Sequence, residues 1–233
     1  MKKYLVAAVA IFGVVAVSGA AVAAPTLSFR VFQDNILQAP LSATSGTGSL
    51  NVVGSTSFFS VVTAFAVGIP VIAPPNLVAQ STITSSLTGF GTGPHSLRLE
   101  FTQTDVPSMS AGGMFANLAN TLTANILVNG FGVNSVSVTN YADAANRAFE
   151  RATLLATQTF TNPGNDASPV ITRSVQLPNA LFSETVVIDA IFNAGGAAVN
   201  ASSQIVAVPE PASLALFGAA LLGLGLMRRR SDI

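Results

Sequence analysis

Few side chains in this sequence have the chemistry of a catalytic centre. His95 is the only histidine, and the chain contains no cysteine. A histidine could serve as a general base, but no Gly-x-Ser-x-Gly elbow accompanies it. A zinc site needs three or four nitrogen, sulfur or carboxylate ligands, so one histidine without cysteine makes zinc improbable. His95 follows Gly93-Pro94 and precedes an alternating segment, and we expect a surface residue at the edge of a turn.

Paired carboxylates are the remaining route to catalysis, because two of them in a cleft can hydrolyse a glycosidic bond. The candidates are Glu100, Asp105, Asp143, Glu150, Glu184 and Asp189. Most alternate with apolar residues, which places them on solvated strand faces. We therefore predict a protein that is not an enzyme, with a glycoside hydrolase-like enzyme as a remote alternative.

Ligand sites are equally sparse. The oxygen-rich stretch 162–166 (NPGND) could bind Ca²⁺, but it lacks EF-hand spacing, so we expect a turn and predict no metal or cofactor. The body has no tryptophan and one tyrosine, Tyr141. Sugar-binding clefts commonly use such rings as platforms, and the chain's fifteen phenylalanines fit a core better. A carbohydrate- or ligand-binding β-sandwich module remains the main alternative to a purely structural role.

The charges exclude nucleic acid as a partner. Lys2, Lys3 and residues 228–230 supply half of the ten basic side chains, and the interior keeps five arginines and no lysine. Nine of the ten acidic residues lie between residues 24 and 211, which gives the body a net charge of −4. Phosphate backbones need clustered cations, and an anionic membrane surface attracts basic segments. Neither is an expected partner of this acidic body.

The first 23 residues have the three-part layout of a secretory signal peptide. Lys2 and Lys3 precede an apolar run of 13 residues, Leu5 to Val17, which is too short for the roughly 20 residues that span a bilayer. Ala21 and Ala23 then provide small side chains for signal peptidase. We predict export through the secretion translocon and cleavage after Ala23.

Residues 212–227 contain no charged side chain, and Arg228, Arg229 and Arg230 follow them. As a transmembrane helix this segment would be about 24 Å long, shorter than the hydrocarbon core of about 30 Å. Its seven leucine and phenylalanine residues favour insertion by about 0.3–0.6 kcal/mol each, whereas each arginine costs about 2.5–3.5 kcal/mol at mid-membrane. We predict a marginal stop-transfer anchor that keeps the arginines in the cytoplasm.

The stretch 208–211, Val208, Pro209, Glu210 and Pro211, precedes that segment. Two prolines fix the backbone and favour extended neighbours, so we expect an accessible strip beside the membrane. The Pro-Glu-Pro triplet 209–211, the apolar span and the arginine cluster resemble the PEP-CTERM sorting signal of Gram-negative bacteria. The resemblance implies processing by exosortase, a membrane-embedded protease or transpeptidase, and delivery to the cell surface or extracellular polysaccharide matrix.

Residues 24–207 are typical of an all-β domain. Alternation of apolar and polar residues predicts strands at 26–31, 96–102, 133–139 and 184–192, and further strands are expected at 52–53, 77–87, 125–128 and 170–175. The apolar run 58–67 is consistent with a strand buried on both sides. Breakers at 46–48, 73–76, 89–94 and 162–166 separate these segments, and 193–198 suggests a flexible hairpin or linker. We predict an antiparallel, jelly-roll-like β-sandwich.

One segment leaves two alternatives open. Alanines at 144, 148 and 152 recur with helical spacing, which allows a helix over 141–155. The stretch SVSVTNYADAANRAF is also similar to a segment of β-rich PEP-CTERM proteins, where a strand leads to an aromatic-x-Asp loop and a second strand that ends in Phe.

We thus expect an exported, tail-processed, non-enzymatic matrix component with three parts: a signal peptide (1–23), a β-sandwich (24–207) and a sorting signal (208–233).

Overall fold

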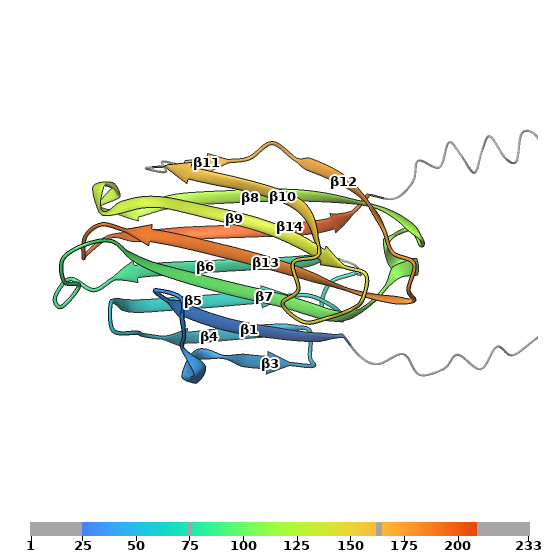
Figure 1. Cartoon of the computed structure of the whole chain (residues 1–233), viewed down its shortest axis with the longest axis horizontal. Coiled ribbons are helices and arrows are strands. Elements are labelled where there is room, and N and C mark those ends of the chain that lie inside the picture. The colour runs from blue at the N-terminus through green and yellow to red at the C-terminus, as the bar shows by residue number, and fades with distance from the viewer. Residues whose placement is uncertain (1–24, 74–75, 162–164, 209–233) are drawn as a thin grey trace, which may run out of the picture.

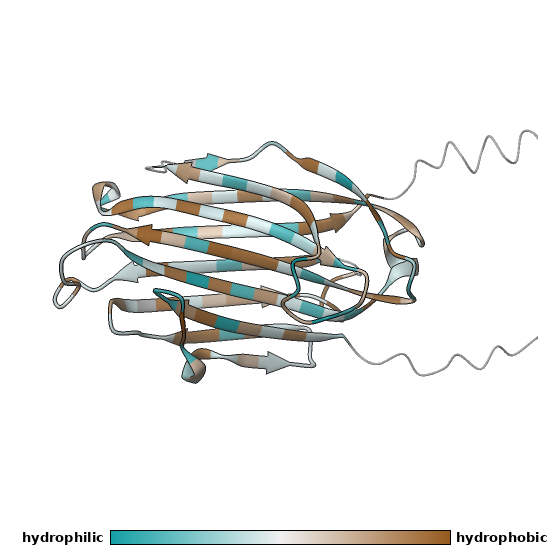
Figure 2. Ribbon diagram, viewed as in Figure 1, coloured by the Kyte–Doolittle hydropathy of each residue, from teal (hydrophilic) through white to brown (hydrophobic). Residues whose placement is uncertain are grey.

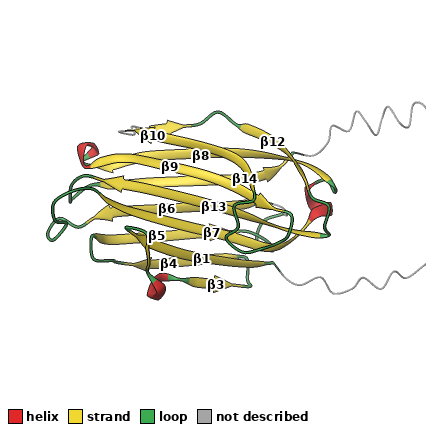
Figure 3. Cartoon of the chain, in the orientation of Figure 1, coloured by secondary structure: helices red, strands yellow, loops and turns green. Residues whose placement is uncertain are grey.

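A computed structural model describes residues 25–73, 76–161 and 165–208 of the chain (Figure 1). These residues form two antiparallel sheets that pack face to face, so the predicted all-β sandwich is confirmed. Their helical segments are three short 3-10 turns, η1 (Ala39–Leu41), η2 (Ser108–Ala111) and η3 (Gly130–Gly132), as Figure 3 shows. The predicted C-terminal transmembrane helix lies outside the described residues. Within them, no helix is long and apolar enough to span a bilayer.

The fourteen strands divide equally between the sheets. They are β1 (Thr26–Gln33), β2 (Ile36–Leu37), β3 (Ala43–Ser45), β4 (Ser49–Gly54), β5 (Phe59–Val67), β6 (Leu77–Ser85), β7 (His95–Pro107), β8 (Phe115–Val128), β9 (Val133–Asp143), β10 (Thr153–Thr161), β11 (Asn165–Ala167), β12 (Ile171–Gln176), β13 (Leu181–Phe192) and β14 (Ala198–Ala207).

Sheet A has the order β10-β9-β13-β7-β1-β2, with β3 also paired to β1. Sheet B has the order β11-β8-β14-β6-β5-β4, with β12 also paired to β8. From β6 onward the chain repeatedly crosses from one sheet to the other, which is the connectivity expected of a jelly-roll-like sandwich.

The core lies between the sheets and follows the two-residue period of the strands. In β7, Leu97, Leu99 and Phe101 point inward and are fully buried, while the residues between them belong to the outer face. Alternating apolar and polar bands along the strands make this pattern visible (Figure 2). The period explains why the alternating segments were predictable.

The strand at residues 59–67 differs from its prediction. We expected burial on both faces, but β5 buries Val62, Ala64 and Ala66 and exposes 41 % of Phe65. Among the described residues nothing covers Phe65 on the outer side of sheet B, so the apolar run reflects one core face plus a surface phenylalanine.

A polar contact also ties the two sheets together within the core. Asn140 of β9 donates to Asn120 of β8 (Nδ2 to Oδ1, 3.0 Å) and accepts from Ser203 of β14 (Oγ to Oδ1, 2.7 Å). All three are buried. Buried polar groups require partners, so these bonds favour one alignment of sheet A on sheet B.

Charge is distributed unevenly between the two sheets. Strands β4, β5, β6, β8 and β14 contain no charged residue at all. Arg30, Arg98, Glu100 and Asp189, by contrast, lie on strands of sheet A. A charged site is therefore expected on the outer face of sheet A.

Candidate functional site

Glu100 is the centre of a charged cluster on the outer face of sheet A. Its strand position alternates with the core-facing Leu99 and Phe101, yet Glu100 is only 1 % exposed. Arginines cover it. Arg30, its register partner on β1, places Nε 2.5 Å from Oε2.

Two further arginines complete this cover. Arg98 Nε lies 2.9 Å from Oε1 of Glu100 as an ion pair, and Arg151 donates through Nη2 to the same oxygen. Three of the five body arginines, which are far apart in sequence, thus converge on one carboxylate. The expectation that Glu100 lies on a solvated face was wrong, because these side chains exclude water from it.

Aromatic rings flank the arginines. The Arg30 guanidinium lies 4.1 Å from the centroid of Phe149, and that of Arg98 lies 4.4 Å from Phe32. Tyr141 is 6.0 Å from Arg151. Such cation–π contacts hold the guanidinium planes in place and give this face a mixed aromatic and cationic character.

Asp189 lies beside this cluster, since it is the register partner of Arg98. Burial raises the pKa of Asp189; Arg98 and Arg151 lower it, Glu100 raises it, and the net change is upward. The cluster therefore combines three arginines and Glu100 with a second acidic side chain, Asp189, whose pKa is raised.

A hollow of about 340 Å³ opens next to Arg30, between β1 and the segment that returns to β3. It is lined by Ser28, Phe29, Arg30, Leu37, Ser42, Ala43, Thr44 and Phe149. The hollow offers hydroxyl groups, the Arg30 cation and the ring of Phe149, while Phe29 is buried in the core. Such groups can hold a polar ligand with an apolar face.

The loop 144–152 carries Phe149 and Arg151 to this site. It contains turns and no helix, so the helical alternative for 141–155 is wrong. The strand-to-loop part of the resemblance is confirmed, but Phe149 lies in the loop and the next strand begins at Thr153. Asn146 and Phe149 have φ of 57° and 59°, a left-handed conformation that ends any helical run.

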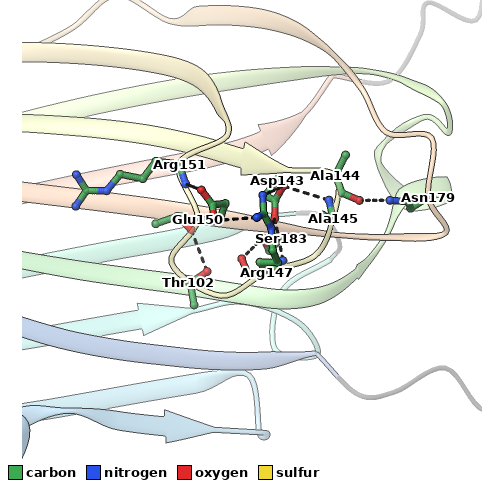
Figure 4. A network of polar contacts seen from close by, with 10 residues as sticks. Thr102, Asp143, Ala144, Ala145, Arg147, Glu150, Arg151, Asn179 and Ser183 are labelled. Carbon is green, nitrogen blue, oxygen red and sulfur yellow. Dashed lines mark hydrogen bonds and ion pairs between the residues drawn. The ribbon is translucent and has the colours of Figure 1, made fainter.

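Asp143 fixes the start of this loop (Figure 4). Its carboxylate accepts from the backbone N–H of Ala145 (3.2 Å) and Arg147 (3.0 Å) and from Arg147 Nε (3.0 Å). Ser183 donates to the Arg147 carbonyl (2.8 Å) from β13. Burial alone raises the pKa of Asp143, but the bonds from Arg147 and Ala145 outweigh burial and lower it.

We expect Asp143→Asn to loosen this loop. A hydrogen bond to a charged acceptor contributes about 1.5–3 kcal/mol, so amide exchange at Ala145 and Arg147 should rise roughly tenfold. In the unaltered chain the protection should persist above the ordinary pKa of aspartate and fall as the pH drops through the lowered one. Hydrogen exchange followed by NMR tests both statements. Unchanged exchange in the variant would show that the loop holds itself.

Glu184 differs from the other acids because it points into the core. Its register partners Gln103 and Ala142 are buried, and it is itself 0 % exposed. Neither carboxyl oxygen has a hydrogen-bond partner among the described residues. Burial raises the pKa of Glu184 well above its usual value. The expected solvated position was wrong here because Glu184 is in phase with the core-facing Val186, Ile188 and Ala190 along β13.

His95 does not form a catalytic pair with a nucleophile. Its Nδ1 lies 2.9 Å from Oδ2 of Asp34, whose other oxygen accepts from the Ser96 N–H (2.8 Å). The ring stacks on Phe58 with centroids 3.6 Å apart. His95 follows a turn, as predicted, but its side chain is only 16 % exposed, so it fastens the β1–β2 turn instead of lying free on the surface.

The metal sites considered from the sequence find no support in the described residues. Within the ranges that the structure describes, no three histidine, cysteine or acidic residues cluster as a metal site would require. Residues 162–164 of the calcium candidate lie outside those ranges, while Asn165–Ala167 form β11, paired with β8.

Asp105 and Glu150 both fasten the loop 144–152. The Asp105 N–H donates to the Asn146 side chain, and the Asn146 amide donates to the Asp105 carboxylate (both 2.8 Å). Glu150 forms an ion pair with Arg147 at 3.3 Å.

Val208, the first residue of the candidate sorting strip, lies within the described residues. Val208 follows β14, is 39 % exposed, and donates its N–H to the Asn117 carbonyl of β8 (2.8 Å). The signal peptidase residues Ala21 and Ala23, the rest of the strip (209–211) and the stop-transfer arginines 228–230 lie outside the described residues.

A model of the PEP-CTERM protein-sorting motif matches residues 207–230. The chain carries a PEP-CTERM sorting signal. The match begins at Ala207, the last residue of β14, so the sorting signal starts where the folded body ends. The motif indicates an exported protein handled by exosortase-type machinery.

No protein of curated function matches the chain in sequence. Among solved structures, the body of this PEP-CTERM protein is similar to TmCBM61 in complex with β-1,4-galactotriose (8 % identity, 77 % of this chain and 88 % of that one, TM-score 0.33). It is also similar to the K3 adhesin domain of Lys-gingipain from Porphyromonas gingivalis (14 %, 57 % and 74 %, TM-score 0.27). Similarity at this level is too loose to indicate a shared ligand.

Proposed function

We propose that this chain is a non-enzymatic component of the cell surface or extracellular polysaccharide matrix, exported with a cleaved signal peptide and held briefly at the inner membrane by its tail. An exosortase-type protease would then read Val208–Pro211 and release or transfer the body. The observation that carries this proposal is the position of the sorting signal. Because it begins as β14 ends, the tail can be removed without taking any strand from the fold.

The surface of sheet B supports a matrix role. Its outer face presents amide and hydroxyl groups that bond one another, as in Asn200 to Thr82 (Nδ2 to Oγ1, 3.0 Å) and Thr123 with Ser202 (2.6 Å). Five of its seven strands, β4, β5, β6, β8 and β14, carry no charged residue. Such a surface can exchange hydrogen bonds with a hydrated polysaccharide without the cost of desolvating ions.

Mass spectrometry of the exported protein tests this proposal. We expect a product that begins at Ala24 and ends near Pro209, without residues 212–233. Glu210→Ala should leave the tail attached and the protein in the membrane fraction. Gln204→Ala, an exposed change on β14, should be processed normally. A mature extracellular product that retains residues 212–233 would refute tail processing.

A second candidate function is binding of a saccharide in the hollow beside Arg30. The observation that favours it is that the half-buried Phe149 and Arg30 line one hollow together with the hydroxyls of Ser28, Ser42 and Thr44. An aromatic face packs against a sugar ring, and the arginine would suit a carboxylated or sulfated sugar.

We expect Phe149→Ala to weaken such binding about tenfold, which corresponds to about 1.4 kcal/mol. Phe131→Ala is the matched control, since Phe131 is 92 % exposed on the η3 turn. A glycan array followed by calorimetry on any hit measures the effect. If no glycan binds, or if both variants lose affinity equally, the hollow is not a binding site.

A further inference from the structure

The body begins and ends at one end of the sandwich. Strand β1 starts and β14 finishes there, and η2 lies at this end, whereas η3 lies at the opposite end (Figures 1 and 3). The sorting signal therefore leaves the body beside η2.

Four exposed apolar side chains gather around this exit. Met109 is 82 % exposed, Met114 59 %, Phe115 60 % and Val208 39 %. We name them the exit patch. Phe115 opens β8 two residues before Asn117, to which Val208 is bonded, and the Met114 carbonyl accepts from the Leu177 N–H (2.8 Å). The patch is thus held by strands and is not a loose loop.

The chain segments that carry the exit patch contain no charged residue, although the charged loop 144–152 reaches this end where Asn179 donates to the Ala144 carbonyl. Segments 106–124, 174–183 and 199–208, which meet at this end, contain no acidic or basic residue. The nearest charged neighbour along β12 is Arg173, which is exposed and makes no ion pair with any described residue. An apolar surface next to one available cation suits the boundary between phosphate headgroups and acyl chains.

The tail limits how far this end can lie from the membrane. Only three residues, 209–211, lie between Val208 and Ala212, where the uncharged segment begins. The four steps from Val208 to Ala212 reach at most about 14 Å when fully extended. The headgroup layer is itself about 5–8 Å thick on each side. An inserted tail therefore brings the exit patch to the lipid surface.

We propose that the exit patch enters the boundary between headgroups and acyl chains of the phospholipid bilayer while the tail is inserted. The end of the body that carries the patch then rests on the membrane. The proposal depends on the tail anchoring described above. The contact is apolar and does not require the acidic body to attract anionic lipid.

The absence of tryptophan from the chain makes a direct test available. Phe115→Trp and, as the matched control at the far end, Phe131→Trp each give a single reporter. The exported chain with its tail, purified from a host without the tail protease, is reconstituted into vesicles of phosphatidylethanolamine and phosphatidylglycerol with bromine at shallow acyl positions. Flotation of the vesicles shows whether the chain is anchored.

We expect both variants to float, with blue-shifted emission and strong bromine quenching for Phe115→Trp and unquenched emission for Phe131→Trp. A floating chain with unquenched Phe115→Trp overturns the contact and leaves the anchor standing. Equal quenching of both reporters overturns it as well, because it would indicate general adhesion. A chain that does not float overturns the anchor and the contact with it. If Phe115→Trp does not fold, Met109→Trp reports on the same patch.

Discussion

Replacing Glu100 by glutamine should destabilise the body by about 2–3 kcal/mol. Removal of one partner from a buried ion pair typically costs about 3–5 kcal/mol. The effect here should be smaller because Arg30 and Arg151 are 34 % and 39 % exposed and solvent screens part of their repulsion. Three guanidinium groups would then face one another without the carboxylate that neutralises them. Urea unfolding at pH 7 gives the difference in free energy of unfolding.

Glu150→Gln is the control for this prediction. Its ion pair with Arg147 is exposed on both sides, 40 % for Glu150 and 58 % for Arg147, and such pairs contribute little. We expect a change within about 0.5 kcal/mol. Equal losses in Glu100→Gln and Glu150→Gln would mean that the charged cluster does not stabilise the sandwich.

Replacing Glu184 by methionine should have the opposite effect and stabilise the body by about 1–3 kcal/mol at neutral pH, the usual cost of a buried polar group without partners. Its raised pKa also sets a pH dependence. Above the ordinary pKa of glutamate the unfolded chain releases the proton while the folded chain retains it. The free energy of unfolding therefore falls as the pH rises, until the raised pKa is passed.

Urea titrations between pH 4 and 9 test this effect. The unaltered protein should lose stability from the Glu184 contribution as the pH rises above the ordinary pKa of glutamate. Glu184→Met should remove that slope. Glu184→Gln keeps a polar amide that does not titrate, so it should also remove the slope. It should gain less stability than Glu184→Met because the buried amide remains polar. Persistence of the slope in both variants would assign it to other groups.

The strands that could be predicted from the sequence are those with one face in the apolar core and the other in a polar environment. Residues 96–102 and 133–139 alternate because one side packs in the core and the other meets solvent or the charged cluster. Strand β14 was missed. Its alanine, serine and asparagine residues follow a stretch interpreted as a hairpin or linker, yet it pairs with both β6 and β8. Small residues suit a central strand of a packed sheet but give a weak apolar period.

The sorting signal could be predicted because its three parts are contiguous, whereas the charged cluster could not. Arg30 and Glu100 become neighbours only through the pairing of β1 with β7, across 70 residues. Arg151 reaches them because Asp143 and two left-handed residues fold the loop back. In the sequence, Glu100 is one acidic residue in an alternating segment, and an ordinary solvent-exposed position has the same pattern.

The strand order has a consequence for secretion. Strands β13 and β14 are the last of the body to be made, and each lies between two earlier strands of its sheet: β13 between β7 and β9, and β14 between β6 and β8. A chain that crosses the membrane from its N-terminus cannot join either pair until nearly all of it has emerged. A tail that pauses in the bilayer would hold the half-assembled sheets beside the translocation channel until the last two strands complete one sheet each, and so delay release until assembly is complete.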